Sequence, residues 1–217
     1  LLDARRMRVQ SETSIGKRLS DLVVSPVDNN LLLTTDEESH ELLAVRRQDE
    51  KFTVIKRLDL SPYPVTIRMT ADGSRACIAS LWSRTITVVD VARWLESKAP
   101  ESSVISAVRL PFAPRELLMI DEAHKLIVAD AFGSKLAVVK LAEGSSDQSH
   151  LESVREILGH GIRKMSRHPT LPRVVMTHQI APESYGLAAY AVIKGMLPKV
   201  VERGVFSKGE LVDALRK

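Results

Sequence analysis

One stretch of the sequence places an aspartate between an apolar β-branched run and a glycine. The stretch reads IVADAFG, residues 127–133, and its Asp130 stands where a carboxylate of a catalytic loop could stand. A similar order of apolar run, polar residue, small residue and aromatic residue occurs about fifty positions earlier in IASLWSR, residues 78–84. The stretch is therefore either a catalytic loop or one unit of a repeat.

Neither the histidines nor a search for known motifs indicates a catalytic or metal-binding site in the sequence. None of the six histidines lies in an H-E-x-x-H motif or beside a cysteine partner. No G-x-S-x-G elbow, Walker loop or G-x-G-x-x-G loop occurs. We therefore predict no catalytic residue and no metal site. His160 and His178 remain of interest because both stand at predicted strand ends.

The elements that would position these residues repeat along the chain. Residues 65–91 align with residues 115–141 without a gap, at an offset of 50 positions. Further copies begin near Leu19 and near Ile162. Each copy contains short runs rich in Val, Ile and Thr with period-two alternation, separated by turn residues. Four short antiparallel strands repeated at this spacing predict an all-β fold, a β-propeller of about four blades that forms a closed or a partial ring. A β-sandwich is the alternative.

The repeat carries a family resemblance. Residues 16–180 resemble the YVTN-type β-propeller repeat proteins, in particular the propeller segments of bacterial propeller/c-type cytochrome fusion proteins. The matching stretches are GKRLSDLVVSP (16–26), SPYPV (61–65), ASLWSRTITVVDVA (79–92), LPFAPRELLMI (110–120), IVADAFGSKLAVV (127–139), VREILGHGIR (154–163) and THQI (177–180). The resemblance implies a periplasmic or extracellular location and an association with haem redox proteins. Because C-x-x-C-H is absent, we expect no cofactor in this chain, and a haem c would belong to an adjoining domain.

The pattern changes after Ile180. Residues 1–180 are predicted to hold the blades, and residues 181–217 a short C-terminal α-helical appendage. Pro198 should interrupt the helical pattern, and Ser207 with Glu210 fits a capping box before a last helix. The appendage is either a docking or dimerising hairpin or a cap over an exposed sheet edge.

Composition excludes several classes of protein. The net charge of +4 comes from interspersed acidic and basic residues, without the basic runs and interleaved aromatic residues of nucleic-acid binders. No apolar stretch reaches the roughly 18–20 residues that a membrane span needs. The sequence shows no signal peptide, and its single cysteine, Cys77, cannot form an internal disulfide.

The repeat also predicts which residues converge. In a propeller, equivalent positions of successive blades meet around a central channel. One such set, at the ends of the second strands, is Thr35, Ser80, Asp130 and His178; another, at the starts of the first strands, is residues 20–21, 65–66, 115–116 and 163–164. The candidate ligand-binding residues at the channel mouth are Asp21, Arg115, Glu116, Asp130, His160, Arg163 and His178. Alternatively, these charges pair with one another and only fix the blade geometry. Trp82 and Phe132 are predicted to pack between blades, and stacking on a ligand is the alternative for them.

These observations predict a non-catalytic binding or scaffold module that takes a protein partner or a small ligand at the channel mouth. One alternative is a metal-dependent, lactonase-like propeller hydrolase that uses Asp21, Glu116, Asp130 and His178 as ligands. Another is a truncated propeller fragment without independent function. Self-association through open blade edges or through the C-terminal helices is also expected.

Overall fold

The structure is a computed structural model, and it describes residues 2–3, 5–10, 12–120, 124–142, 148–157, 161–167 and 174–178. The chain divides into two compact units, Leu1–His178 and Gln179–Lys217. The expected helical appendage, residues 181–217, lies outside the described residues.

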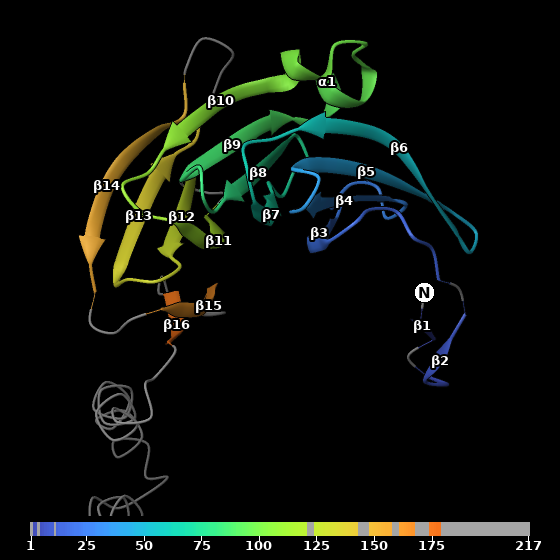
Figure 1. Ribbon diagram of the computed structural model, residues 1–217, viewed down its shortest axis with the longest axis horizontal. Coiled ribbons are helices and arrows are strands. Elements are labelled where there is room, and N and C mark those ends of the chain that lie inside the picture. Colours follow the sequence, from blue (N-terminus) through green and yellow to red (C-terminus); the bar gives the residue numbers. More distant parts are fainter. Residues whose placement is uncertain are drawn as a thin grey trace, which may run out of the picture. The chain divides into compact units, whose positions relative to one another are not determined.

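Three four-stranded antiparallel sheets follow one another along the first unit (Figure 1), and we call them blades 1, 2 and 3. Blade 1 consists of β3 (Leu19–Val24), β4 (Leu31–Asp36), β5 (Glu41–Gln48) and β6 (Lys51–Asp59). Blade 2 consists of β7 (Pro64–Met69), β8 (Arg75–Ser80), β9 (Thr85–Asp90) and β10 (Val104–Arg109). Blade 3 consists of β11 (Pro114–Ile120), β12 (Lys125–Asp130), β13 (Lys135–Lys140) and β14 (His150–Glu156). In each blade the strands lie side by side in chain order, as the repeat predicts.

Two shorter pairs of strands flank the blades. The pair β15 (Ile162–Arg167) and β16 (Val174–His178) follows blade 3, and the pair β1 (Leu2–Asp3) and β2 (Arg8–Val9) precedes blade 1. A short helix, α1 (Val91–Glu96), and a 3₁₀ turn, η1 (Pro100–Ser103), lie between β9 and β10 (Figure 1). Asp90 caps α1 by accepting a hydrogen bond from the backbone N–H of Arg93.

The hydrophobic core lies between neighbouring blades. Leu33 and Leu42 of blade 1 pack with Ile67 of blade 2. Cys77 of blade 2 packs with Leu117 of blade 3. The next cluster joins blade 3 to β15, and its buried members are Ala129, Ile162 and Met165. Since the middle strands of a blade are covered on both faces, they read as nearly continuous apolar runs; β8, for example, is ACIAS after its first residue.

Every first strand of a blade carries the same irregularity. The register shifts between Leu19 and Asp21 in β3, and it shifts at the corresponding places in β7, β11 and β15. Such a β-bulge places two residues of one strand opposite one residue of its partner. The register of the strand pairs corrects one equivalence that the sequence predicted. Asp36, not Thr35, lies opposite Leu19, as Ser80 lies opposite Pro64.

The four first strands are neighbours in succession. β3 contacts β7, β7 contacts β11, and β11 contacts β15. The bulges of these strands therefore come together at one end of the blades. The residue after each bulge is Asp21, Thr66, Glu116 and Lys164 in turn.

Candidate functional site

A cavity of about 670 Å³ lies at this end of the first strands. Four of the candidate residues from the sequence line it: Asp21, Arg115, Glu116 and Arg163. They come from β3, β11 and β15, which are far apart in the sequence and are brought together by the repeat. We call it the channel-mouth cavity. Glu116 is buried in its wall, whereas Arg115 and Arg163 are exposed.

Arg68 of β7 joins the two carboxylates of the cavity. Its Nη1 lies 2.8 Å from Oδ2 of Asp21, and its Nη2 lies 3.3 Å from Oε1 of Glu116. The same Nη1 donates to the backbone carbonyl of Ile67 at 2.6 Å. Lys164 adds a weaker contact, with Nζ 3.9 Å from Oε1 of Glu116. One guanidinium therefore neutralises carboxylates from the blade before it and the blade after it.

Hydroxyl groups tie the same strands together. Ser20 Oγ donates to the carbonyl of Pro64 at 2.7 Å and lies 2.9 Å from Thr35 Oγ1. Thr66 Oγ1 donates in the same way to the carbonyl of Arg115. The backbone N–H of Ile67 donates to Oδ2 of Asp21 at 3.0 Å. Apart from the contact between Ser20 and Thr35, which lies within blade 1, these bonds cross from one blade to the next, so the floor of the cavity is a connected polar network.

Sequence reasoning did not single out Arg68. The alternative in which the charged residues pair with one another considered only the candidate residues, whereas the structure pairs Asp21 with Arg68. A signal was present in the sequence, because Arg68 interrupts the otherwise apolar end of the run TIRM. A charge in an apolar strand is costly unless it has a partner, and here it has two.

Aromatic side chains line the rim beside the cavity. The ring centroids of Tyr63 and Trp82 lie 6.1 Å apart in an edge-to-face arrangement, and Trp82 stacks on Phe132 at 6.1 Å. Tyr63 and Trp82 also line the cavity itself. The expected contact between blades is present for Trp82 and Phe132, yet the two side chains are 59% and 62% exposed. They consequently offer open aromatic surface.

Asp130 faces its own turn. Its Oδ1 accepts the backbone N–H of Phe132 at 3.1 Å, and it is absent from the residues that line the channel-mouth cavity. A Cβ added to Gly133 would lie 2.4 Å from Oδ2 of Asp130, so glycine is required for this close approach. The aspartate before the glycine, which first suggested a catalytic loop, holds a turn between β12 and β13.

Asp36 has the same place in blade 1. Its carboxylate accepts backbone N–H groups of Lys17, Arg18, Glu38 and Ser39. Burial alone would raise the pKa of Asp36, but these four hydrogen bonds outweigh burial and hold the pKa below its ordinary value. Asp36 therefore stays ionised and stabilises the loop before β3 and the turn after β4.

The structure does not describe the side chains of the two candidate histidines. His160 lies outside the described residues. The backbone of His178 pairs with Ile162 at the end of β16, but the position of its side chain is not described. Both remain predictions from the sequence.

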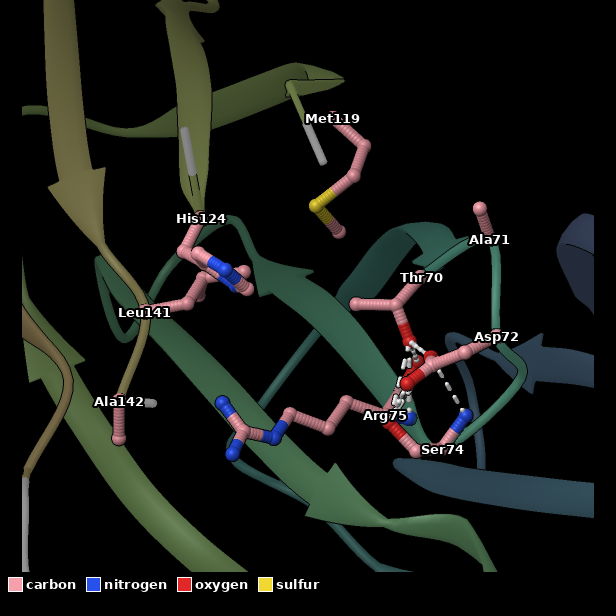
Figure 2. A pocket seen from close by; sticks show the side chains of 9 residues that line it. All are labelled: Thr70, Ala71, Asp72, Ser74, Arg75, Met119, His124, Leu141 and Ala142. Atoms are coloured by element: carbon pink, nitrogen blue, oxygen red, sulfur yellow. Dashed lines mark hydrogen bonds between the residues drawn. The ribbon is translucent and has the colours of Figure 1, made fainter. Parts of the chain in front are cut away.

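A second hollow of about 290 Å³ lies at the opposite end of the strands, between blades 2 and 3. Figure 2 shows Arg75 and His124 beside it, together with the turn that joins β7 to β8. Asp72 accepts hydrogen bonds from Thr70 Oγ1 at 2.6 Å and from the backbone N–H of Ser74 at 3.0 Å. These bonds, the Thr70 hydroxyl first, lower the pKa of Asp72. The polar groups of the turn thus satisfy one another, and we place the candidate site in the larger cavity.

Comparison with known proteins extends the description of the fold. No family model and no curated protein matches the sequence. Solved structures do match, among them Kuenenia stuttgartiensis hydrazine synthase, with a TM-score of 0.62 and 16% identity over 81% of this chain and 46% of that one. A putative 6-phosphogluconolactonase from Bacteroides uniformis matches with a TM-score of 0.62 and 9% identity over 74% of this chain and 47% of that one.

The fold is a β-propeller. A structure of the dihydro-heme d1 dehydrogenase NirN in complex with DHE is also similar, with a TM-score of 0.57 and 13% identity over 82% of this chain and 36% of that one. The propeller spans less than half the length of these three structures. At such identities the similarity shows the fold alone, and the narrower YVTN resemblance stays a prediction.

Two kinds of feature are absent from the described part of the propeller. None of its helices has the length and apolar character to cross a membrane. Within the same residues, no three side chains of His, Cys, Asp or Glu form a group that could hold a metal ion.

Proposed function

We propose that this propeller is a non-catalytic binding module whose channel-mouth cavity takes an anionic ligand with a planar portion. The observation that carries the proposal is the combination of excess positive charge inside the cavity with open aromatic surface on its rim. The positive charge and the aromatic rim would each bind a different region of the ligand. The charge recognises acidic groups, and the aromatic rim recognises a flat, apolar face.

The charge balance of the cavity favours an anion. Five of its described lining residues are cationic (Arg18, Arg68, Arg115, Arg163 and Lys164), and three carry carboxylates (Asp21, Glu37 and Glu116). Internal ion pairs join Arg18 to Glu37 and Arg68 to Asp21 and Glu116. A concave site with an excess of one charge concentrates the field and raises the local concentration of the oppositely charged ligand. Guanidinium groups also bind carboxylates and phosphates with two parallel hydrogen bonds.

The rim supplies the second part of the recognition. Trp82 lines the cavity and is 59% exposed, so a flat ligand can cover it. Aromatic pairs contribute about 0.5–1.5 kcal/mol beyond the burial of their area. A ligand held by both features would place its acidic groups toward Arg115 and its flat portion against Trp82.

The lactonase-like alternative would need carboxylates available to coordinate a metal ion. The carboxylates of Asp21 and Glu116 instead share the guanidinium of Arg68. The described residues therefore favour the binding module over the hydrolase. The structural match to NirN in complex with DHE supports testing tetrapyrrole-like ligands. The association with haem redox proteins and the extracytoplasmic location stay predictions.

The test uses a planar tetra-anion, pyrene tetrasulfonate, in isothermal titration calorimetry. We expect saturable binding that weakens as salt is added, and a loss of about 10-fold in affinity when Arg115→Ala removes one charge-assisted hydrogen-bonding group, roughly 1.4 kcal/mol. Arg109→Ala is the matched control, because Arg109 is an exposed arginine of β10 that does not line the cavity. The proposal is overturned if the anion does not bind, if a planar tetra-cation binds equally well, or if both variants lose the same affinity.

A further inference from the structure

We propose that a row of aromatic side chains beside the channel mouth binds a proline-rich protein segment that carries acidic residues at its ends. The proposal deepens the binding role proposed above by naming the partner, and it rests on that proposed function because Tyr63 and Trp82 both line the cavity and belong to the row. In such a segment the proline rings supply the flat apolar face, and the acidic residues supply the negative charge.

Four rings from three blades form the row, which we call the aromatic row. In order along it the members are His40, Tyr63, Trp82 and Phe132, with neighbouring ring centroids 5.7, 6.1 and 6.1 Å apart. Three of them lie in the turns that join the second and third strands of blades 1, 2 and 3, and Tyr63 lies between β6 and β7. The repeat therefore brings rings that are far apart in the sequence into one line.

The row gathers the exposed aromatic surface of the described chain. Tyr63, Trp82 and Phe132 are 37%, 59% and 62% exposed, and they are the only exposed Phe, Trp or Tyr side chains among the described residues. By contrast, Trp94 and Phe112 are buried. A contiguous exposed apolar patch marks an interaction site in a soluble protein, and Trp and Tyr contribute most of the affinity at such sites.

Tyr63 is held in place without any ligand. Its φ is 62°, in the left-handed region that bulky residues rarely adopt. Its backbone N–H donates to Nδ1 of His40 at 3.2 Å, and its carbonyl accepts the backbone N–H of Leu81 at 2.8 Å. Residues in such conformations persist only where the surrounding structure fixes them, and they occur preferentially at binding sites. A surface fixed in advance loses little conformational freedom when a partner binds.

The row has the spacing and the donors that a polyproline II helix requires. This helix rises about 3.1 Å per residue, so two of its residues cover about 6.2 Å, close to the separation of the rings. It has no internal hydrogen bonds, so its carbonyl groups accept hydrogen bonds from a partner. Within the described part of the chain, the Tyr63 hydroxyl and the Trp82 indole N–H make no hydrogen bond, so both can donate to these carbonyls. Aromatic surfaces of this kind bind proline-rich segments.

The row is longer than the cavity. Tyr63 and Trp82 line the cavity, whereas His40 and Phe132, at the two ends of the row, are not among its described lining residues. A partner that covers all four rings therefore extends past the cavity in both directions. This length favours a chain segment over a compact molecule.

The charge of the cavity sets the charge of the segment. Cationic side chains outnumber carboxylates among its described lining residues, and one of them, Arg115, is exposed. The side chain of Arg18 is 65% exposed as well, although it pairs with Glu37. Complementary charges speed association and exclude partners of the wrong sign. We therefore expect acidic residues next to the prolines, where they reach the arginines while the prolines cover the rings.

Fluorescence anisotropy with a labelled decapeptide tests the proposal. The peptide has six prolines flanked by two glutamates at each end. We expect saturable binding that weakens as salt is added. Two control peptides should bind at least about 10-fold more weakly, one with lysines in place of the glutamates and one with glycine and serine in place of the prolines.

Three variants place the peptide on the row. Trp82→Ala should weaken binding by at least about 10-fold, because truncating an aromatic anchor is costly at an interface. Phe132→Ala should weaken peptide binding by about 5-fold and leave the affinity for pyrene tetrasulfonate nearly unchanged, because Phe132 belongs to the row but does not line the cavity. Ile55→Ala is the control, since Ile55 is 43% exposed on β6 and lies outside the row. Circular dichroism verifies that each variant is folded.

The outcomes separate this inference from the proposed function. If pyrene tetrasulfonate binds and the acidic proline peptide does not, the partner is wrong and the anion site stands. If neither binds, both proposals are overturned. Equal affinity for either control peptide or for an acidic oligosaccharide also overturns the inference, as does an equal loss in Phe132→Ala and Ile55→Ala.

Discussion

Replacing Arg68 by methionine, R68M, should reveal how much the network beneath the channel mouth stabilises the propeller. The substitution keeps a long apolar side chain and leaves Asp21 and Glu116 without their shared cation. The side chains of Arg68, Asp21 and Glu116 are 27%, 27% and 12% exposed, between a surface pair and a buried one. Breaking a surface pair costs about 0.2–1 kcal/mol, and breaking a buried pair costs about 3–5 kcal/mol. We therefore expect R68M to lower the free energy of unfolding by about 2 kcal/mol.

Urea denaturation followed by circular dichroism measures this loss, and thermal unfolding should show Tm lower by about 4–8 °C for a domain of this size. The matched control is Arg57→Met, because Arg57 pairs with Glu41 at 2.6 Å at a more exposed site, with side chains 49% and 19% exposed. That variant should lose only about 0.5 kcal/mol. If R68M loses no more than the control, Arg68 does not join the blades energetically and our reasoning about the network is wrong.

Two other substitutions test the turns. Asp36→Asn should destabilise the protein by about 1–2 kcal/mol at pH 7, because the ionised carboxylate accepts four backbone N–H groups. Since the pKa of Asp36 is lower in the folded protein than in the unfolded chain, this stabilisation is present above the unfolded value of about 3.9 and is lost as the pH falls below it. Urea titrations at pH 7 and pH 3 should therefore show the gap between variant and parent narrowing, and a constant gap would refute the assignment. Gly133→Ala should cost about 1–3 kcal/mol by bringing Cβ against Asp130, and an unchanged urea midpoint would contradict that contact.

Much of the fold could be predicted from the sequence because the blades repeat it. The gapless match between residues 65–91 and 115–141 reflects second and third strands of six residues each that begin at equivalent positions in blades 2 and 3. The period-two alternation lies where the structure has strands, as in β6, whose residues are alternately more and less exposed. The turn residues between β7 and β8 include Gly73, which has a positive φ. The repeat further predicted that Asp21 and Glu116 would stand at equivalent places, since residue spacing within a strand is fixed.

What escaped prediction depended on register and on partners across blades. The equivalence of Thr35 was wrong by one residue because six residues separate β3 from β4, whereas five separate β7 from β8. The role of Arg68 depends on carboxylates that lie 47 and 48 positions away, which no local pattern reveals. The exposure of Trp82 could not be read from the sequence either, because an aromatic residue after a strand is compatible with burial between blades or with an open rim.

The most direct test of the channel-mouth site observes its two tryptophans separately. The chain has only two, Trp82 on the rim and Trp94, which is buried on α1. In the NMR spectrum of nitrogen-labelled protein, each gives one indole N–H signal, and Trp82→Phe assigns them. Titration with pyrene tetrasulfonate should shift the Trp82 signal, with the affinity found by calorimetry, and leave the Trp94 signal in place. A stationary Trp82 signal in the presence of bound ligand, or equal shifts of both, would contradict a ligand site at the channel mouth.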